Sequence, residues 1–148
     1  MRDNIIFTKL WQDHEVIELK VVCLSSVATI TSRIYVSDAL IDELICQIKQ
    51  FLEDNDKEGL WANEGRGNDS VACLSLRFFR KDKLGHIVIE VFAELDDGGD
   101  YTTHNCCFYV NTEYGLLMSF CENISRLKEN PIGCEVQLWG QGDGSPVS

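Results

Sequence analysis

The sequence predicts an α+β fold, a single domain in which an antiparallel β-sheet packs against two amphipathic helices. Several segments alternate apolar and polar residues with a period of two, which is typical of half-buried strands. Two longer segments instead carry apolar residues at helical spacing, so each would present one apolar stripe. The segments between the strands are short and turn-like, which favours antiparallel neighbours over crossover connections.

The N-terminal part of the chain predicts three strands. The first spans residues 5–11, and we expect Trp11 to anchor it to the core. The second spans residues 17–23 and alternates apolar residues with charged ones, which predicts a charged outer face. The third, over residues 27–36, is rich in the β-branched residues that fit a pleated surface.

The first helix is predicted from Asp38 to about Glu53. Ser37 precedes it and is a favourable N-cap, and the carboxylate of Asp38 lies in the first turn, where the helix dipole favours negative charge. The apolar stripe of this helix consists of Leu40, Ile41, Leu44, Ile45, Ile48, Phe51 and Leu52. We expect this stripe to face the sheet.

Residues 55–69 are polar and contain several glycines, which predicts a loop with Leu60 and Trp61 as its packing points. Beyond this loop, apolar alternation predicts three strands, separated by turns rich in charges and glycine. Their expected ranges are 72–79, 87–95 and 103–110.

A second amphipathic helix follows these strands. Asn111 or Thr112 is expected to cap it, and its apolar stripe continues to Leu127. Pro131 and Gly133 end the helical pattern. A final strand is then predicted over residues 134–139.

These elements predict one domain over residues 1–140 and a flexible tail over residues 141–148. Within the domain, two β-β-α-like halves, residues 1–54 and 70–140, would be joined by the loop at 55–69.

The two halves also show a weak internal sequence similarity. Tyr35-Val36-Ser37 precedes the first helix and Tyr109-Val110-Asn111 precedes the second. The apolar stripes of the two helices match at a constant shift of 76 positions, as from Leu40 to Leu116. Duplication and a chance likeness between amphipathic helices both explain this.

The composition excludes some classes of partner and favours another. The 148 residues include 24 acidic and 13 basic ones, which gives a net charge of −11. A chain of this charge is repelled by nucleic-acid phosphates and by anionic membrane surfaces, so we expect it to bind neither. It would attract a basic protein and accelerate the encounter with it. The alternative is that the acidity only keeps the protein dispersed.

The location of the protein is expected to be cytoplasmic. No apolar run approaches the roughly 20 residues that span a bilayer, and the N-terminal residues make a poor secretory signal. The 7 cysteines are an odd number and lie mostly inside predicted strands and helices. Buried free thiols explain them better than a disulfide framework does.

The chain carries no clear motif for catalysis or metal binding. His104, Cys106 and Cys107, with His86 from a neighbouring strand, lack the ligand spacing of a zinc site, and strand alternation places the two thiols on opposite faces. No nucleophile elbow is present. We therefore expect no metal, no cofactor and no enzymatic activity. An enzyme that uses Cys106 or Cys107 with a histidine is the less favoured alternative.

Acidic residues instead suggest a contact surface for a cationic partner. Glu90 and Glu94 are expected to project from the polar face of one central strand, with Asp96 and Asp97 in the turn beyond it. Glu64 lies in the middle loop, and Trp61 beside it would serve as an aromatic anchor. The competing interpretation is that these carboxylates are only solvated surface.

The order of features also resembles a known family. Leu74-Ser75-Leu76 is followed across a charged turn by the run from Leu84 to Glu90, then by Phe108-Tyr109-Val110 and a helix of the Leu116-x-x-x-Phe120 kind. Over residues 15–128 this layout resembles the WapI-type immunity proteins, bacterial antidotes encoded beside polymorphic toxins. The N-terminal stretch and the cysteine content depart from the family pattern.

The resemblance implies a non-enzymatic, stoichiometric inhibitor that covers a cognate toxin C-terminal domain, commonly a nuclease. A nuclease has basic surface that holds phosphates, so an acidic inhibitor could imitate the charge of its substrate. The alternative function is a small regulatory or structural subunit in the cytoplasm. The sequence leaves open whether the protein forms a homodimer.

Overall fold

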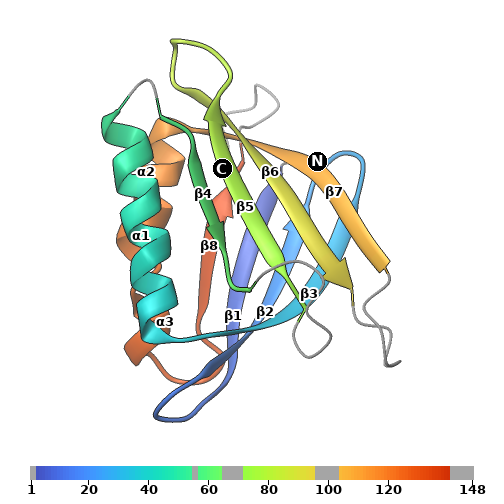
Figure 1. The fold of residues 1–148 in the computed structure, drawn as a ribbon, viewed down its shortest axis with the longest axis vertical. Coiled ribbons are helices and arrows are strands. Elements are labelled where there is room, and N and C mark those ends of the chain that lie inside the picture. Colours follow the sequence, from blue (N-terminus) through green and yellow to red (C-terminus); the bar gives the residue numbers. More distant parts are fainter. Residues whose placement is uncertain (1–2, 55–56, 65–71, 96–103, 141–148) are drawn as a thin grey trace.

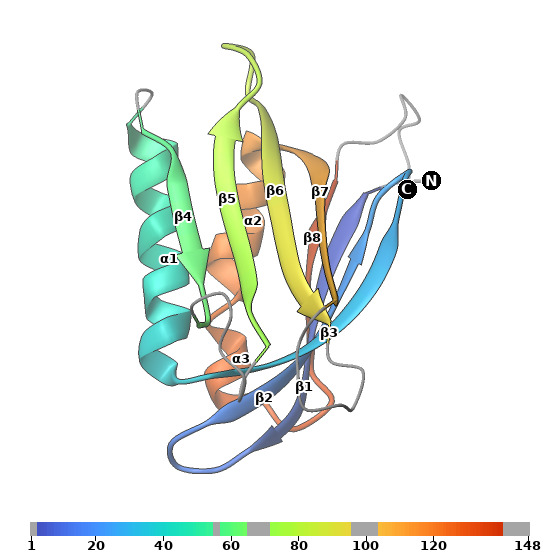
Figure 2. The same ribbon diagram turned by 45° about the vertical axis from the view of Figure 1, so that its right-hand side comes forward.

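The computed structural model describes residues 3–54, 57–64, 72–95 and 104–140. In these residues eight strands form two four-stranded antiparallel sheets, packed with helices into a single small α+β domain. The predicted fold class is therefore confirmed, but the one predicted sheet is in fact two. Figures 1 and 2 show the two sheets crossing, with the two longer helices packed together along one flank.

The first sheet combines the N-terminal strands with the C-terminal one. In spatial order it contains β3 (Thr29–Val36), β2 (Ile17–Leu24), β1 (Asn4–Gln12) and β8 (Glu135–Trp139). The predicted strands in this part of the chain are confirmed to within two residues at their ends, because their alternation is regular and their turns are short.

The second sheet contains β4 (Gly59–Ala62), β5 (Leu74–Arg80), β6 (His86–Leu95) and β7 (His104–Glu113), in that order. Strand β4 lies inside the segment that was predicted to be a loop, so that prediction is wrong there. Four residues are too few to show alternation, but Leu60 points outward and the buried Trp61 points inward, opposite Leu76 of β5.

Helix α1 spans Asp38–Glu53, as predicted. The Ser37 side-chain oxygen accepts a 3.2 Å hydrogen bond from the backbone N–H of Leu40 and so caps the first turn. The other end is capped from β5, because the Arg80 guanidinium donates to the Phe51 carbonyl at 2.7 Å and lies 4.4 Å from the Phe51 ring centroid.

The second helical region begins later than the sequence indicated. Helix α2 spans Tyr114–Asn123, and α3 (Arg126–Glu129) is a separate single turn. Asn111 and Thr112 are strand residues and cap no helix, so the predicted cap is wrong. The Asn111 N–H donates to the Asp3 carboxylate, and the Thr112 hydroxyl donates to the Trp139 carbonyl, each at 2.9 Å. These bonds hold both residues in β7.

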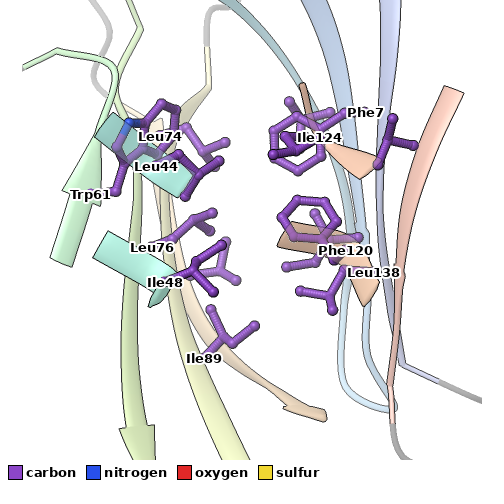
Figure 3. Close-up of a cluster of buried hydrophobic side chains, with 14 of the residues drawn as sticks. Phe7, Leu44, Ile48, Trp61, Leu74, Leu76, Ile89, Phe120, Ile124 and Leu138 are labelled. Carbon is purple, nitrogen blue, oxygen red and sulfur yellow. The ribbon is translucent and has the colours of Figure 1, made fainter. Parts of the chain in front are cut away.

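Each sheet packs against its own helix. Helix α1 precedes β4 to β7 and contacts their sheet, while α2 and α3 precede β8, which joins β1 to β3 in the other sheet. In Figure 3, Leu44 of α1 lies beside Trp61, whereas Phe120 of α2 lies across from them beside Leu138. A helix packed against a four-stranded sheet therefore occurs twice, although only β8 of the first sheet follows its helix along the chain. This grouping differs from the predicted halves at 1–54 and 70–140, because α1 packs against the sheet that follows it.

The core contradicts one expectation about β1. Trp11 is 46% exposed and does not anchor the strand, because the register with β2 shifts between Lys9 and Trp11 and breaks the alternation. Lys9 is buried instead, and its ammonium donates to the Gln12 side chain and to the Asn130 carbonyl, each at 2.6 Å. Across the described residues no helix has the length and apolar character needed to cross a membrane.

Candidate protein-binding face

Side chains on the second sheet that point away from the helices form a mixed aromatic and charged surface. Because side chains alternate along each strand, Phe78, Ile89 and Val91 point inward and are fully buried, and the residues next to them point outward. We call the surface formed by the outward-pointing side chains the β4–β7 outer face. It is defined by Leu60, Arg77, Phe79, Val88, Glu90 and Tyr109. The four strands bring Leu60, Arg77, Glu90 and Tyr109 into one row across the sheet.

Arg77 is the centre of a charge cluster on this face. Its guanidinium lies 2.9 Å from the Glu58 carboxylate and 3.9 Å from the Glu90 carboxylate. The Tyr109 hydroxyl donates to the other side of the cluster, at 3.3 Å from Glu90 Oε2. The cluster therefore combines two carboxylates with one cation. Because these groups are largely exposed, the ion pairs orient the side chains more than they stabilise the fold.

The same contacts shift two pKa values. The hydrogen bond to Glu58 raises the pKa of the Arg77 guanidinium, and the charge of Glu90 raises the pKa of the Tyr109 phenol. Both groups therefore keep their protons at neutral pH. Tyr109 is a neutral hydrogen-bond donor, and Glu58 and Glu90 supply the negative charge.

Aromatic and apolar side chains surround the charge cluster. Phe79 and Tyr109 make an edge-to-face contact with ring centroids 6.3 Å apart, and the Arg77 guanidinium lies 5.6 Å from the Phe79 centroid. Leu60 is 58% exposed and Tyr109 is 50% exposed. Tyrosine, phenylalanine and arginine are enriched in protein–protein contacts, so this face has the composition of a binding surface.

The structure brings some of the predicted site residues to this surface. Glu90 lies at its centre, and Glu64 is exposed two residues beyond β4. Asp96 and Asp97 lie outside the described residues. Glu58, which the sequence analysis missed, is the closest carboxylate to Arg77. In the sequence Glu58 is an acidic residue next to Gly59 in a polar segment. It indicates a contact residue only once β4 is recognised as a strand.

Trp61 and Glu94 were also predicted to be in the binding surface, and the structure corrects both. Trp61 is 2% exposed, and its indole N–H donates to the Leu40 carbonyl at 2.9 Å, so it anchors α1 to β4. Glu94 is on the predicted side of β6 but is only 5% exposed, and its carboxylate accepts a 3.0 Å hydrogen bond from the Cys73 N–H. Both side chains are structural.

A hollow lies between α1 and α2. It has a volume of about 340 Å³ and is lined by Lys49, Leu52, Glu53, Tyr114, Met118, Cys121 and Glu122. Burial raises the pKa of the Cys121 thiol, which also contacts the Ile45 carbonyl at 3.7 Å. This thiol is protonated at neutral pH and is a poor nucleophile.

His86 lies far from the thiols that were considered for chemistry. His86 pairs with Glu113 at one end of the β6–β7 ladder, whereas Cys106 pairs with Ala93, seven residues along β6. At about 3.4 Å per residue this separation is roughly 24 Å. The His86 ring is instead 2.6 Å from the Asp82 carboxylate. Among the described residues, no group of three or more His, Cys, Asp or Glu side chains could hold a metal ion.

Comparison of the chain with protein-family models, with curated proteins and with solved structures gives no match.

Proposed function

We propose that this protein is an immunity protein that binds and neutralises a cognate bacterial toxin domain, most simply a basic nuclease, without enzymatic activity. The β4–β7 outer face is the contact surface in this proposal. The observation that carries it is the combination of exposed Leu60 and Tyr109 with the Glu58 and Glu90 carboxylates on one rigid sheet. The net charge of −11 and the resemblance of the sequence to WapI-type immunity proteins support the same function.

The two kinds of side chain contribute in different ways. Carboxylates at the surface attract a basic partner over several ångströms and raise the association rate, an effect that salt screens. The apolar and aromatic side chains exclude water on contact and lower the dissociation rate. Because Arg77 already orients Glu58 and Glu90, these carboxylates lose little side-chain freedom when a cation approaches.

The area of the β4–β7 outer face can be compared with the area that a stable interface needs. Four strands spaced by about 4.8 Å, each contributing about seven residues of about 3.4 Å, cover roughly 450 Å². The side chains on this footprint have a larger accessible surface than its flat area, and a stable interface takes about 800 Å² of accessible surface from each partner. A toxin domain that covers more than this footprint would also contact a neighbouring part of the molecule.

Co-expression tests this function directly. The proposal predicts a toxin gene directly upstream of this one, and the toxin domain that it encodes is induced in a bacterial host with and without this protein. We expect the protein to restore growth and to co-purify with the toxin domain in a one-to-one complex. Unrestored growth together with no complex would contradict the proposal and favour the alternative of a regulatory or structural subunit.

A further inference from the structure

We propose that β3 is a docking strand: the toxin domain lays an extended segment along its outer edge and adds a fifth strand to the first sheet. This inference rests on the proposed function, because the partner is the same toxin domain. It would add contact area to that of the β4–β7 outer face. In Figure 2, β3 lies at the margin of the first sheet, and no described helix or strand lies beyond it.

Each of the other three sheet margins has at least one contact from another described part of the chain. Helix α1 packs against β4, where the Leu60 N–H donates to the Gln47 side chain at 3.4 Å. Helix α2 packs against β8. On β7, the Asp3 carboxylate accepts the outward N–H of Asn111 at 2.9 Å. Along β3, by comparison, the described residues make no hydrogen bond to the outward backbone groups.

The register of β3 shows which backbone groups it offers. Ser25 donates its N–H to the Ala28 carbonyl at 2.8 Å, so this pair of the β2–β3 hairpin is hydrogen-bonded. Bonded and non-bonded pairs alternate from there along an antiparallel ladder. The N–H and C=O groups of four residues therefore point away from β2: Thr29, Thr31, Arg33 and Tyr35. In the described residues they have no further backbone partner.

A buried hydroxyl at the centre of β3 independently indicates a missing neighbour. Ser32 is 5% exposed, and its Oγ has no hydrogen-bond partner among the described residues. A buried hydroxyl without a partner is costly, so such groups are rare in folded proteins. The residue opposite Ser32 on an added strand would have its Cβ about 5 Å away, within reach of a side-chain hydrogen bond.

These positions define the chemistry of the docking segment. A serine, threonine or asparagine facing Ser32 would satisfy its hydroxyl. The adjacent residue of the segment points to the opposite face, towards Arg33, whose own contact with Glu18 is long at 3.7 Å. An aspartate or glutamate there would pair with Arg33. The segment is thus an extended stretch in which a small polar residue stands next to an acidic one.

Two substitutions in the full-length protein test this, with affinity for the purified toxin domain as the readout. Ser32→Ala removes the unpartnered hydroxyl, so it should raise the melting temperature of the free protein and yet weaken the complex about fivefold. Thr31→Pro removes an N–H that the free fold does not use, which edge strands tolerate. It should weaken the complex about tenfold, whereas Thr31→Ala, which keeps the N–H, should not.

Hydrogen exchange measured on the wild-type complex tests the docking strand even if Thr31→Pro disturbs the fold. In the wild-type complex, the amides of Thr31, Arg33 and Tyr35 should become protected. Unchanged exchange at these amides, with a complex of undiminished affinity in Ser32→Ala, would overturn the docking strand and leave the proposed function standing. A wild-type protein that does not bind the toxin domain at all would overturn both.

Discussion

The phenol of Tyr109 donates a hydrogen bond to the carboxylate of Glu90, its direct cross-strand neighbour, at 3.3 Å. The same pair recurs in the other sheet, where Tyr35 donates to Glu18 at 2.9 Å. The likeness between the two sheets therefore extends to individual surface side chains. The surroundings of the two pairs differ. In the second sheet Phe79 and Leu60 lie on the same face as the pair and make that face more apolar.

Loss of the Tyr109 ring is expected to weaken toxin binding at least about tenfold, because tyrosine is enriched among the hot spots of protein interfaces. Calorimetric titration of the toxin domain into Tyr109→Ala measures this. Tyr114→Ala is the matched control, since Tyr114 is 41% exposed but lies on α2, beside the hollow between α1 and α2. Equal affinities for the two variants would exclude the β4–β7 outer face as the contact surface.

Neutralising Glu58 and Glu90 together is expected to slow association and to flatten its dependence on salt, with little change in the dissociation rate. Surface plasmon resonance from low to high ionic strength measures both rates. Glu135→Gln on β8 serves as the control, because Glu135 is exposed but belongs to the other sheet. A variant whose association rate still falls with salt as steeply as the wild type would show that other charges steer the partner.

Trp61→Phe is expected to destabilise the protein by about 2 kcal/mol, because it leaves the Leu40 carbonyl without its donor and leaves a void beside α1. Urea unfolding followed by circular dichroism measures the change. Trp11→Phe alters an exposed side chain and should stay within about 0.5 kcal/mol of the wild type. Similar losses in the two variants would contradict the structural role of Trp61.

Thiol labelling should separate buried from exposed cysteines. Burial raises the pKa of the Cys23 thiol to about 12, so at pH 8 it is protonated as well as inaccessible. Cys46 is exposed and should alkylate readily in the same sample. Mass spectrometry after iodoacetamide treatment compares the two. Rapid labelling of Cys23 in the folded protein would contradict the described packing.

The same shift has a consequence for stability. The ordinary pKa of 9.0 applies to the Cys23 thiol in the unfolded chain, and the raised value of about 12 applies in the folded protein. Below pH 9 the thiol is neutral in both states, so the folded protein has its full stability. As the pH rises from 9 towards 12, only the unfolded state ionises, and the free energy of unfolding should fall. Cys23→Ala should flatten this fall.

The parts of the fold that depend on local chemistry were predictable from the sequence. The bounds of α1 follow from the Ser37 cap and the apolar stripe, and most strands follow from alternation. The division into two sheets depends on long-range pairing, such as Asn4 with Trp139, which no local pattern encodes. The start of α2 depends on the bond from Asn111 to the distant Asp3.

The candidate site was predictable only in part, for a related reason. Alternation assigns Glu90 and Glu94 to one face of β6, but it does not reveal that the Cys73 backbone lies against Glu94. Trp61 stands in a polar stretch and looks exposed until β4 is paired with β5. Apolar side chains on an outer face, such as Phe79, look like core residues in a sequence.

Binding of the upstream-encoded toxin domain to this protein, measured by titration calorimetry, tests the central proposal most directly. The β4–β7 outer face predicts a one-to-one complex whose affinity falls sharply when Tyr109 is replaced together with Glu58 and Glu90. An undetectable interaction, or a complex that this triple variant forms as tightly as the wild type, would contradict it.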